Sequence, residues 1–373
     1  MSETNVVCKA NDEDFMRRAL ALAETGVSVT PPNPSVGALI VKDGIVLASG
    51  RTQRAGGPHA EVMALREAMA KNVETQGATL YVTLEPCAHY GRTPPCALAV
   101  RAAGFARVVV AMLDPNPLVS GKGCEMVREA GIEVSGPLLQ EEAFWLNRGF
   151  FTRMQTGRPW VRLKSAATLD GRTAFEDGRS QWITGPAARE DNQRARARAG
   201  AIVTGVGTVL ADDPSLNVRL AGAERQPIRV VVDSRMRTPP SAKLFSLPGE
   251  VWVVAAREDE ARRRALERAG AKVFVMTGED GRTDLRALLR ALADVQVNEV
   301  HLEAGAALSG SFMAAELVDE ILLYQAPCFF GGGRGIADVP RPVSPGGAER
   351  WRVRETALVG ADLKTVLTRS DAQ

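Results

Sequence analysis

The sequence has little of what would mark an extracellular or nucleic-acid-binding protein. Its 373 residues include only 5 cysteines, an odd number spread without a pairing pattern, which argues against a disulfide framework. Aromatic residues make up 5% of the chain, and 46 Lys and Arg against 44 Asp and Glu leave a formal net charge of +2. The composition therefore offers no electrostatic case for a nucleic-acid partner.

Long hydrophobic runs are absent as well. No apolar stretch reaches membrane-spanning length, and residues 1–14 are polar and acidic without the apolar centre of a secretory signal. We therefore expect a cytoplasmic protein that acts on a small molecule and has no nucleic-acid or membrane partner. The sequence leaves the oligomeric state open, and a homo-oligomer is one outcome.

The length and the hydrophobic pattern predict two α/β domains, at residues 1–157 and 158–373, joined by a linker over residues 153–159. In the first domain we expect helices at 12–23, 97–103, 124–130 and 144–151, and strands at 36–41, 45–48, 79–84 and 107–112. Such an alternation is typical of a three-layer α/β fold. In the second domain we expect strands at 161–166, 201–205, 228–233, 251–255 and 321–326, and a helix at 261–269.

Three good zinc ligands and one acid stand in the first domain. His59 and Glu61 are separated by one residue, and Cys87, preceded by Pro86, is followed after eight residues by Cys96. One imidazole and two thiolates suit a tetrahedral Zn²⁺ whose fourth position is left for water, as in a catalytic site. The order H-x-E, then P-C and a second Cys, is that of zinc-dependent deaminases, although their usual cysteines are two residues apart.

Glu61 can serve the same metal as His59 only at a helix end. Side chains at positions i and i+2 point about 200° apart around a helix. They share a target if the helix begins near Pro58, because the metal then lies beyond the helix end. Glu61 would there take the proton that a zinc-bound water loses.

The second domain carries two glycine-containing turns. Residues 205–210 begin with Gly-x-Gly, but Leu210 stands where a third glycine would be, so the Rossmann fingerprint fails. Residues 299–310 predict a strand that runs through a small-residue turn into a helix. Free backbone N–H groups at such a turn bind a diphosphate, or the small residues serve only tight packing, and the stretch alone favours neither.

Three polar residues of the first domain are candidates for substrate contacts. Asn33 lies between two prolines, and its amide could hydrogen-bond a heterocycle. Asp114 and Asn116 follow a predicted strand, at the edge where open α/β sheets bind ligands. From chemistry alone, ordinary turn formation explains each of them as well.

Several longer segments carry a family resemblance over nearly the whole chain. They are residues 32–37 (PNPSVG), 59–61 (HAE), 85–96 (EPCAHYGRTPPC), 114–117 (DPNP), 165–172 (SAATLDGR), 180–184 (SQWIT) and 210–214 (LADDP). In these segments the chain resembles the bifunctional deaminase-reductases of riboflavin biosynthesis. The eight-residue gap between the two cysteines is a feature of that family.

The resemblance implies two consecutive reactions. An N-terminal domain of cytidine-deaminase-like fold, with one Zn²⁺ per chain, would hydrolyse the 2-amino group of 2,5-diamino-6-(5-phosphoribosylamino)pyrimidin-4(3H)-one. A C-terminal domain of dihydrofolate-reductase-like fold would then use NADPH to reduce the ribosyl group, which gives 5-amino-6-(5-phosphoribitylamino)uracil.

The resemblance also implies site residues. Glu61 would be catalytic, and His59, Cys87 and Cys96 would bind the metal. The positions that would bind NADP are Ala166, Trp182, Thr208, Asp212, Ser234, Gly305, Ala306, Ala307, Leu308, Ser309, Gly310 and Ser311. The positions that would bind substrate are Asn33, His89, Arg92, Asp114, Asn116, Lys164, Ser180, Arg196, Leu216, Arg219 and Glu303. Arg196 and Arg219 would meet the substrate phosphate of the reductase, and Lys164 or Asp212 would assist opening of the sugar ring.

Two rival interpretations make different predictions. A deaminase of nucleic-acid bases would need a basic, aromatic-lined channel, which the composition does not favour. A zinc-stabilised interaction module without catalysis would need a fourth protein ligand that closes the metal site.

Overall fold

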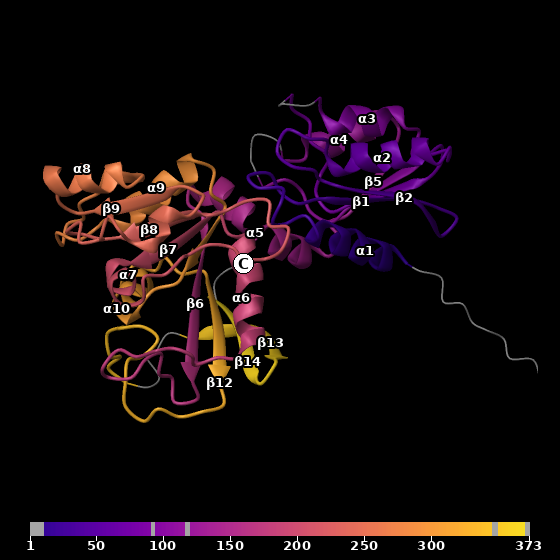
Figure 1. The fold of residues 1–373 in the computed structure, drawn as a ribbon. Coiled ribbons are helices and arrows are strands. Elements are labelled where there is room, and N and C mark those ends of the chain that lie inside the picture. The colour runs from indigo at the N-terminus through magenta and orange to yellow at the C-terminus, as the bar shows by residue number, and fades with distance from the viewer. Residues whose placement is uncertain (1–10, 91–93, 116–119, 345–349, 370–373) are drawn as a thin grey trace, which may run out of the picture. The chain divides into compact units, whose positions relative to one another are not determined.

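A computed structural model of the chain describes residues 11–90, 94–115, 120–344 and 350–369 (Figure 1). The chain divides into two compact units, residues 1–156 and 157–373. Arg92 and Asn116, two of the expected substrate contacts, lie outside the described residues. Among the described residues, no helix combines the length and the hydrophobicity needed to cross a bilayer.

The first unit is built on a five-stranded mixed sheet in the order β2-β1-β3-β4-β5. The hairpin of β1 (Gly37–Lys42) and β2 (Ile45–Arg51) turns at Asp43 and Gly44, both at positive φ, which is the backbone that an Asp-Gly hairpin turn favours. The strands β3 (Thr79–Val82), β4 (Arg107–Val110) and β5 (Glu133–Ser135) run parallel to one another. Their carboxyl ends therefore meet at one edge of the sheet, where ligands bind in such folds.

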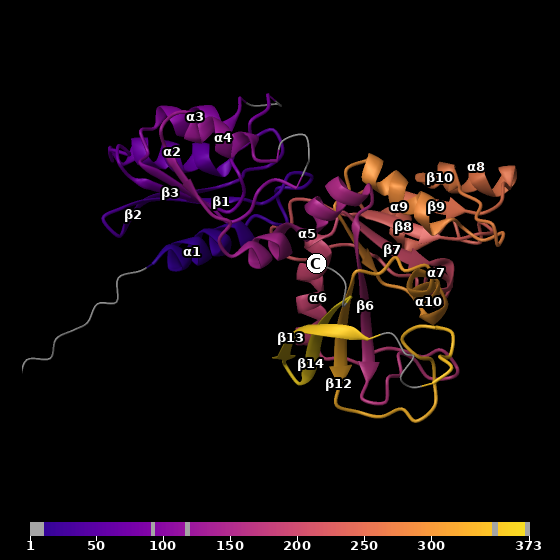
Figure 2. The same cartoon turned by 180° about the vertical axis from the view of Figure 1, so that it is seen from behind.

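Helices cover both faces of this sheet. Helix α1 (Asp12–Glu24) begins with a capping box at Asn11 and buries Phe15, Met16 and Ala19. Figures 1 and 2 show α1 on one face, with α2 (Ala60–Ala70), α3 (Cys96–Ala102) and α4 (Lys122–Arg128) on the other. Helix α5 (Gln140–Thr156) closes the unit. The three-layer α/β arrangement expected from the sequence is confirmed.

Glycine at position 50 brings α2 close to the sheet. A Cβ at Gly50 would lie 2.3 Å from the carbonyl oxygen of Ala60 and 2.3 Å from the backbone nitrogen of Ala64. Any larger residue would push the first turn of α2 away from β2. The start of α2, which carries His59 and Glu61, is therefore set by backbone contact with the sheet.

The second unit has a nine-stranded sheet in the order β10-β9-β8-β7-β11-β6-β12-β14-β13. Seven strands are parallel: β6 (Trp160–Thr168), β7 (Ala201–Gly205), β8 (Ile228–Val232), β9 (Val251–Ala255), β10 (Ala271–Val275), β11 (Glu299–Leu302) and β12 (Glu320–Ala326). The antiparallel strands β13 (Trp351–Val359) and β14 (Asp362–Arg369) extend the sheet beside β12 (Figures 1 and 2).

The helices of the second unit bury the apolar strands from both sides. Leucines of α9 (Leu285–Asp294) and Phe312 of α10 (Ala306–Ala314) pack in the main core. Helices α7 (Val206–Asp212) and α8 (Glu260–Arg268) pack with smaller clusters around Val231 and Val253. Helix α6 is Pro186–Arg198, and a short 3-10 helix, η1, is Lys243–Ser246.

The structure corrects the expected linker. Residues 153–156 belong to α5, which continues to Thr156, so only residues 157–159 separate the helix from β6. The hydrophobic pattern also did not predict β5, β10, α9, β13 and β14. The strands at the edges of the sheets are short or half exposed, which weakens their alternation.

Candidate functional site

Three candidate metal ligands of the first unit come together although they lie far apart in the sequence. His59 is the N-cap of α2, Cys87 follows β3, and Cys96 is the first residue of α3. The His59 Nδ1 lies 3.2 Å from the Cys96 Sγ and 3.6 Å from the Cys87 Sγ, and all three ligand atoms lie within 4.8 Å of one another. Tetrahedral zinc holds nitrogen and sulfur ligands roughly 3.6 Å apart.

The donor set fits a zinc ion. The Cys96 thiol donates a hydrogen bond to Cys87, and together with His59 it lowers the pKa of Cys87 to about 4. The Cys96 backbone N–H also donates to the Cys87 Sγ, at 3.2 Å. The thiolate is the form of cysteine that binds a metal, so the site stabilises a ligand in its binding form.

Glu61 lies beside these ligands, in the first turn of α2, and its side chain is buried. Burial raises the pKa of Glu61 to about 7, with the charge of Cys87 acting in the same direction and the backbone hydrogen bond and His59 opposing it. A carboxyl with such a pKa exchanges protons readily near neutral pH. Among the described residues, the cluster that could hold a metal contains three ligands, His59, Cys87 and Cys96. It therefore does not support a structural zinc site that is closed by a fourth protein ligand.

Glu85 holds backbone groups of the segment that follows β4. It stands in the EPC motif, but no role was expected for it. Its buried carboxylate accepts hydrogen bonds from the backbone N–H groups of Asp114, Gly121, Gly123 and Cys124, at 2.8 to 3.2 Å. Glu85 comes after β3 and two residues before Cys87. One carboxylate thus ties the loop of Asp114 to the segment that carries a metal ligand.

The remaining expected residues of the first unit have different surroundings. Asn33 is half-buried in the turn before β1, and the neighbouring Ser35 is fixed through its backbone N–H and C=O by the side chain of Asn147. His89 is exposed, and Asp114 is half-buried.

A cavity of about 2070 Å³ opens at the carboxyl ends of the parallel strands in the second unit. Most of the expected cofactor and substrate residues line it: Lys164, Ala166, Ser180, Trp182, Arg196, Thr208, Asp212, Leu216, Arg219, Ser234, Glu303, Gly305, Ala306, Ala307, Leu308 and Ser311. Ser309 and Gly310 are buried and are not part of this lining.

The turn from β11 into α10 suits an anionic ligand. The first backbone N–H of α10 that bonds within the helix is that of Ser309, which donates to the Gly305 carbonyl. The preceding N–H groups face the helix end, where backbone donors and the helix dipole favour phosphate. A Cβ at Gly305 or at Gly207 would meet no protein atom within 4 Å, so the cavity has room for a bulky group beside both turns.

Glu303 at the end of β11 is held by a dense network. Its Oε1 accepts from the Arg196 Nε at 2.6 Å and its Oε2 from an Arg196 terminal nitrogen at 2.7 Å. Burial opposes ionisation of Glu303, but the charge and hydrogen bonds of Arg196 outweigh it and hold the pKa well below its usual value. Arg196 also donates to the carbonyl of Asn217, so both edges of its guanidinium are bonded within the protein.

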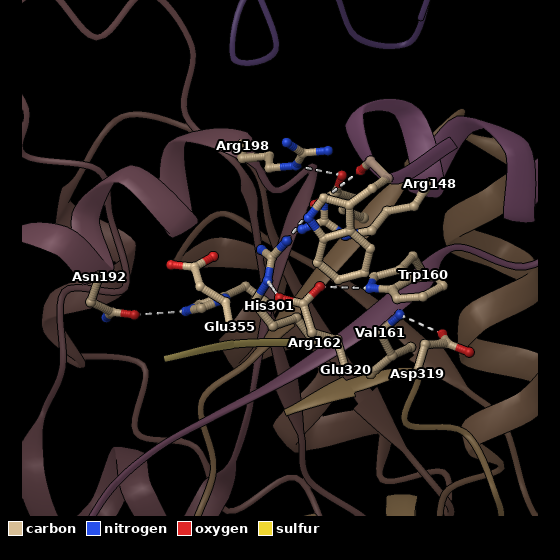
Figure 3. Close-up of polar contacts among 12 residues, drawn as sticks. Arg148, Trp160, Val161, Arg162, Asn192, Arg198, His301, Asp319, Glu320 and Glu355 are labelled. Carbon is tan, nitrogen blue, oxygen red and sulfur yellow. Dashed lines mark hydrogen bonds and ion pairs between the residues drawn. The ribbon is translucent and has the colours of Figure 1, made fainter. Parts of the chain in front are cut away.

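Asn192 and His301 both contact the carboxylate of Glu303. The His301 Nε2 lies 3.0 Å from the Asn192 Oδ1 (Figure 3). It also lies 3.1 Å from the Glu303 Oε1, and the Asn192 side-chain nitrogen donates to Glu303 at 3.2 Å. Burial lowers the pKa of His301, so the imidazole is neutral and donates from Nε2. Neither residue was expected at the site: His301 lies in the predicted strand at the start of residues 299–310, and Asn192 lies outside every motif.

A second buried network in Figure 3 is structural. Arg162 on β6 pairs with Glu320 at 2.6 Å and with Glu299 at 2.9 Å, and Trp160 donates to Glu320. These residues lie at the starts of β6, β11 and β12, at the end of the strands opposite to the cavity. They fix the pairing of the three strands at that end.

Comparison with known proteins assigns a family to each unit and to the whole. Residues 9–112 match the cytidine and deoxycytidylate deaminase zinc-binding region, and residues 159–365 match the RibD C-terminal domain. The riboflavin biosynthesis protein RibD of Escherichia coli is 46% identical over 94% of this chain and 98% of its own length. The chain belongs to the RibD family.

Solved RibD structures agree with this assignment. Form 1 of RibD from Acinetobacter baumannii has a TM-score of 0.87 and 42% identity, over 96% of this chain and 99% of its own. A diaminohydroxyphosphoribosylaminopyrimidine deaminase/5-amino-6-(5-phosphoribosylamino)uracil reductase from Thermotoga maritima has a TM-score of 0.85 and 33% identity, over 96% and 98%.

Membership of the RibD family confirms several expectations from the sequence. The chain is a bifunctional enzyme of riboflavin biosynthesis, with a zinc-binding deaminase domain and a reductase domain that uses NADPH. The expected fold class is confirmed as well. The interpretation as a non-enzymatic zinc module is thereby excluded.

Proposed function

We propose that the first domain hydrolyses an amino group from a pyrimidine at His59, Cys87 and Cys96, which would hold the zinc ion. The observation that carries this proposal is the convergence of one imidazole nitrogen and two sulfurs within 4.8 Å, next to a buried carboxylate. When bound there, zinc would polarise a water molecule and lower the pKa of that water toward neutrality.

Glu61 is the proton carrier in this proposal. Its carboxylate accepts a proton from the attacking water as the new carbon–oxygen bond forms at the ring carbon. It delivers that proton to the ring nitrogen. It then accepts the second proton, from the newly formed hydroxyl group, and passes it to the departing amine, so that ammonia leaves as the carbon–nitrogen bond breaks and a carbonyl remains. The burial of the Glu61 side chain in the first turn of α2, which begins next to His59, supports this role.

The substrate of the deaminase is the diaminopyrimidine ribotide that the name of the Thermotoga relative describes. In this chain it is 2,5-diamino-6-(5-phosphoribosylamino)pyrimidin-4(3H)-one. Asn33 would hydrogen-bond the pyrimidine, supported by the fixed turn around Ser35. Asp114 and Asn116 would contact the sugar, and His89 and Arg92 would lie near the phosphate.

In the second domain the residues that line the cavity would hold NADPH, and the start of α10 would bind its diphosphate. The free N–H groups before Ser309 and the open space beside Gly207 and Gly305 support this placement. NADPH supplies the hydride that reduces the sugar carbon. Ala166, Trp182, Thr208, Asp212 and Ser234 line the same cavity and would contact the cofactor.

The ribotide substrate of the reductase lies beside Ser180, Leu216 and Glu303. Arg219 is exposed in the cavity and would contact the phosphate together with Arg196, which also holds Glu303. Burial lowers the pKa of Lys164, so its ammonium can release a proton when the sugar ring opens. Asp212 is the alternative acid, because burial raises its pKa.

The two sites can be tested separately in the full chain. Purified protein is incubated with the diaminopyrimidine ribotide, with and without NADPH. We expect ammonia release without NADPH, and NADPH oxidation only once the deaminated product is present. Glu61→Gln should lower the rate of ammonia release by roughly 10²- to 10⁴-fold and leave reduction of added product unchanged. Loss of both activities in this variant would contradict separate sites.

We place the enzyme in the cytoplasm, because thiols that serve as metal ligands persist in a reducing compartment. Homo-oligomerisation stays a prediction, for which light scattering of the purified protein is the direct measurement.

A further inference from the structure

The cavity of the second domain continues beyond the residues assigned so far. Along the sheet, β6, β11, β7 and β8 are consecutive neighbours, so the loops after them line the cavity in that order. Three strand spacings of about 4.8 Å separate β6 from β8, a span of about 14 Å. If the reacting end of NADPH lies by β6 and its diphosphate by β11, its adenosine half lies over the loops after β7 and β8.

The loop after β8 is a rigid turn. The buried Asp233 carboxylate accepts hydrogen bonds from the backbone N–H of Thr238 at 2.6 Å and from its hydroxyl at 2.7 Å. Met236 is held at a φ of +51°, which disfavours an L side chain, and its buried side chain packs with Val253, Ala255 and Leu266. The turn presents Arg237, which is exposed, between two buried neighbours.

Arg237 is a cation available to a ligand. It lines the cavity together with Ser234, and no hydrogen bond or ion pair of its side chain is found among the described residues. Several other charged residues of the lining are bonded within the protein: Arg282 pairs with Asp280 at 3.9 Å, and Asp284 caps α9. The Arg286 side chain donates to the Ala315 carbonyl.

Two hydroxyl groups lie at the same end of the cavity. The Ser234 Oγ lies 3.2 Å from the Thr283 Oγ1 and accepts from the Thr283 backbone N–H at 3.3 Å. Both residues line the cavity. A guanidinium next to hydroxyl groups is a suitable set of donors for a phosphate monoester.

We infer that Arg237, with Ser234, binds the 2′-phosphate of NADPH and makes the reductase select NADPH over NADH. The inference rests on the placement of NADPH proposed above. A charge-assisted hydrogen bond to phosphate is strong enough that its loss lowers affinity by about 10- to 100-fold. The loss should fall only on ligands that carry the 2′-phosphate.

Arg235 is a matched control on the same turn. It is exposed, as Arg237 is, but it does not line the cavity. The variants Arg237→Gln and Arg235→Gln therefore remove the same charge from the same loop and differ in whether that charge faces the cavity. Arg237→Lys retains the charge but not the planar fork of donors, and should keep an intermediate preference.

Binding is measured by titration calorimetry with adenosine 2′,5′-bisphosphate and with adenosine 5′-monophosphate. For Arg237→Gln we expect about 10- to 100-fold weaker binding of the bisphosphate and less than about 3-fold change for the monophosphate. Steady-state assays should show a higher KM for NADPH with kcat retained, and an unchanged KM for NADH. Arg235→Gln should match the wild type throughout.

Two results would overturn the inference. One is an unchanged affinity of Arg237→Gln for the bisphosphate. The other is an equal loss of affinity for the bisphosphate and the monophosphate, since it would mean that Arg237 does not contact the 2′-phosphate or that the substitution damages the fold. If Arg237→Gln does not fold, the variant Arg237→Lys tests the inference in its place. The inference is then contradicted if Arg237→Lys binds the bisphosphate in preference to the monophosphate as strongly as the wild type does, and if the affinity for the bisphosphate depends on salt concentration as it does in the wild type. A wild-type chain that binds neither nucleotide would instead refute the cofactor placement itself.

Discussion

Replacing Glu85 by Gln should destabilise the deaminase domain more than any exposed charge change near it. The carboxylate accepts four backbone hydrogen bonds, two on each oxygen. Glutamine keeps one oxygen and turns an NH₂ group toward the other two N–H groups, which are left unsatisfied. Two lost bonds to a charged acceptor cost roughly 1.5–3 kcal/mol each, and about 4 kcal/mol together is a reasonable central value.

Such a loss is large enough to measure by calorimetry. For a domain of this size, 1 kcal/mol shifts Tm by about 2–4 °C, so we expect the transition of the first unit to fall by about 12 °C. Below that temperature the loop of Asp114 should be misplaced, which lowers deaminase kcat/KM while NADPH oxidation on supplied product remains. The reductase activity of the same molecule thus serves as an internal control.

Glu125→Gln provides the matched comparison. Glu125 is exposed in the first turn of α4, one residue after the segment that Glu85 holds. Its replacement should shift Tm by less than about 2 °C. If Glu85→Gln shifts Tm no more than Glu125→Gln does, the four hydrogen bonds do not stabilise the loop as argued.

Three further outcomes are expected. Removal of zinc with a chelator should stop ammonia release, leave reduction of the deaminated product intact and be reversed by added Zn²⁺; loss of both activities would contradict a metal confined to the first domain. The pKa of Glu303 is held below its usual value. Its contribution to the free energy of unfolding is therefore fully present above the unfolded pKa of about 4.3 and is lost as pH falls through the folded pKa. In urea titrations, the free energy of unfolding should fall more between pH 6 and pH 3 for the wild type than for Arg196→Gln. Gly310→Ala should cost roughly 1–3 kcal/mol and weaken NADPH binding, because its Cβ would lie 2.1 Å from the Asp338 carbonyl oxygen; Gly335→Ala, where a Cβ meets nothing within 4 Å, should change neither urea stability nor the fold.

Much of the architecture followed from local pattern. The buried strands β7 and β9 match the predicted ranges, and the others in the centres of the sheets differ by a few residues at their ends. The continuation of α5 through Arg153 was missed because Gly157 and Pro159 suggested an earlier stop. Edge strands such as β13 carry exposed residues on both faces, so their pairing depends on a neighbouring strand that periodicity does not contain.

Residue types and their spacing were enough to indicate the metal chemistry, since few ligand sets contain one imidazole and two thiolates beside an acid. The sequence could not show which charged side chains form ion pairs within the protein and which face a ligand. Arg196 bonds Glu303 through two of its nitrogens, a pairing that no motif indicates, and its expected contact with a phosphate stays a prediction.

The amino-acid sequence by itself determined the central strands and most of the helices, the zinc-ligand chemistry and the family, because these depend on local periodicity and on short motifs. Only the tertiary structure decided which cations are bonded within the protein and which, such as Arg237, face the cavity. It also decided that Glu85 holds the loop of Asp114. Hydrogen bonds between residues far apart in the chain make these choices, and they form only when the strands are packed side by side.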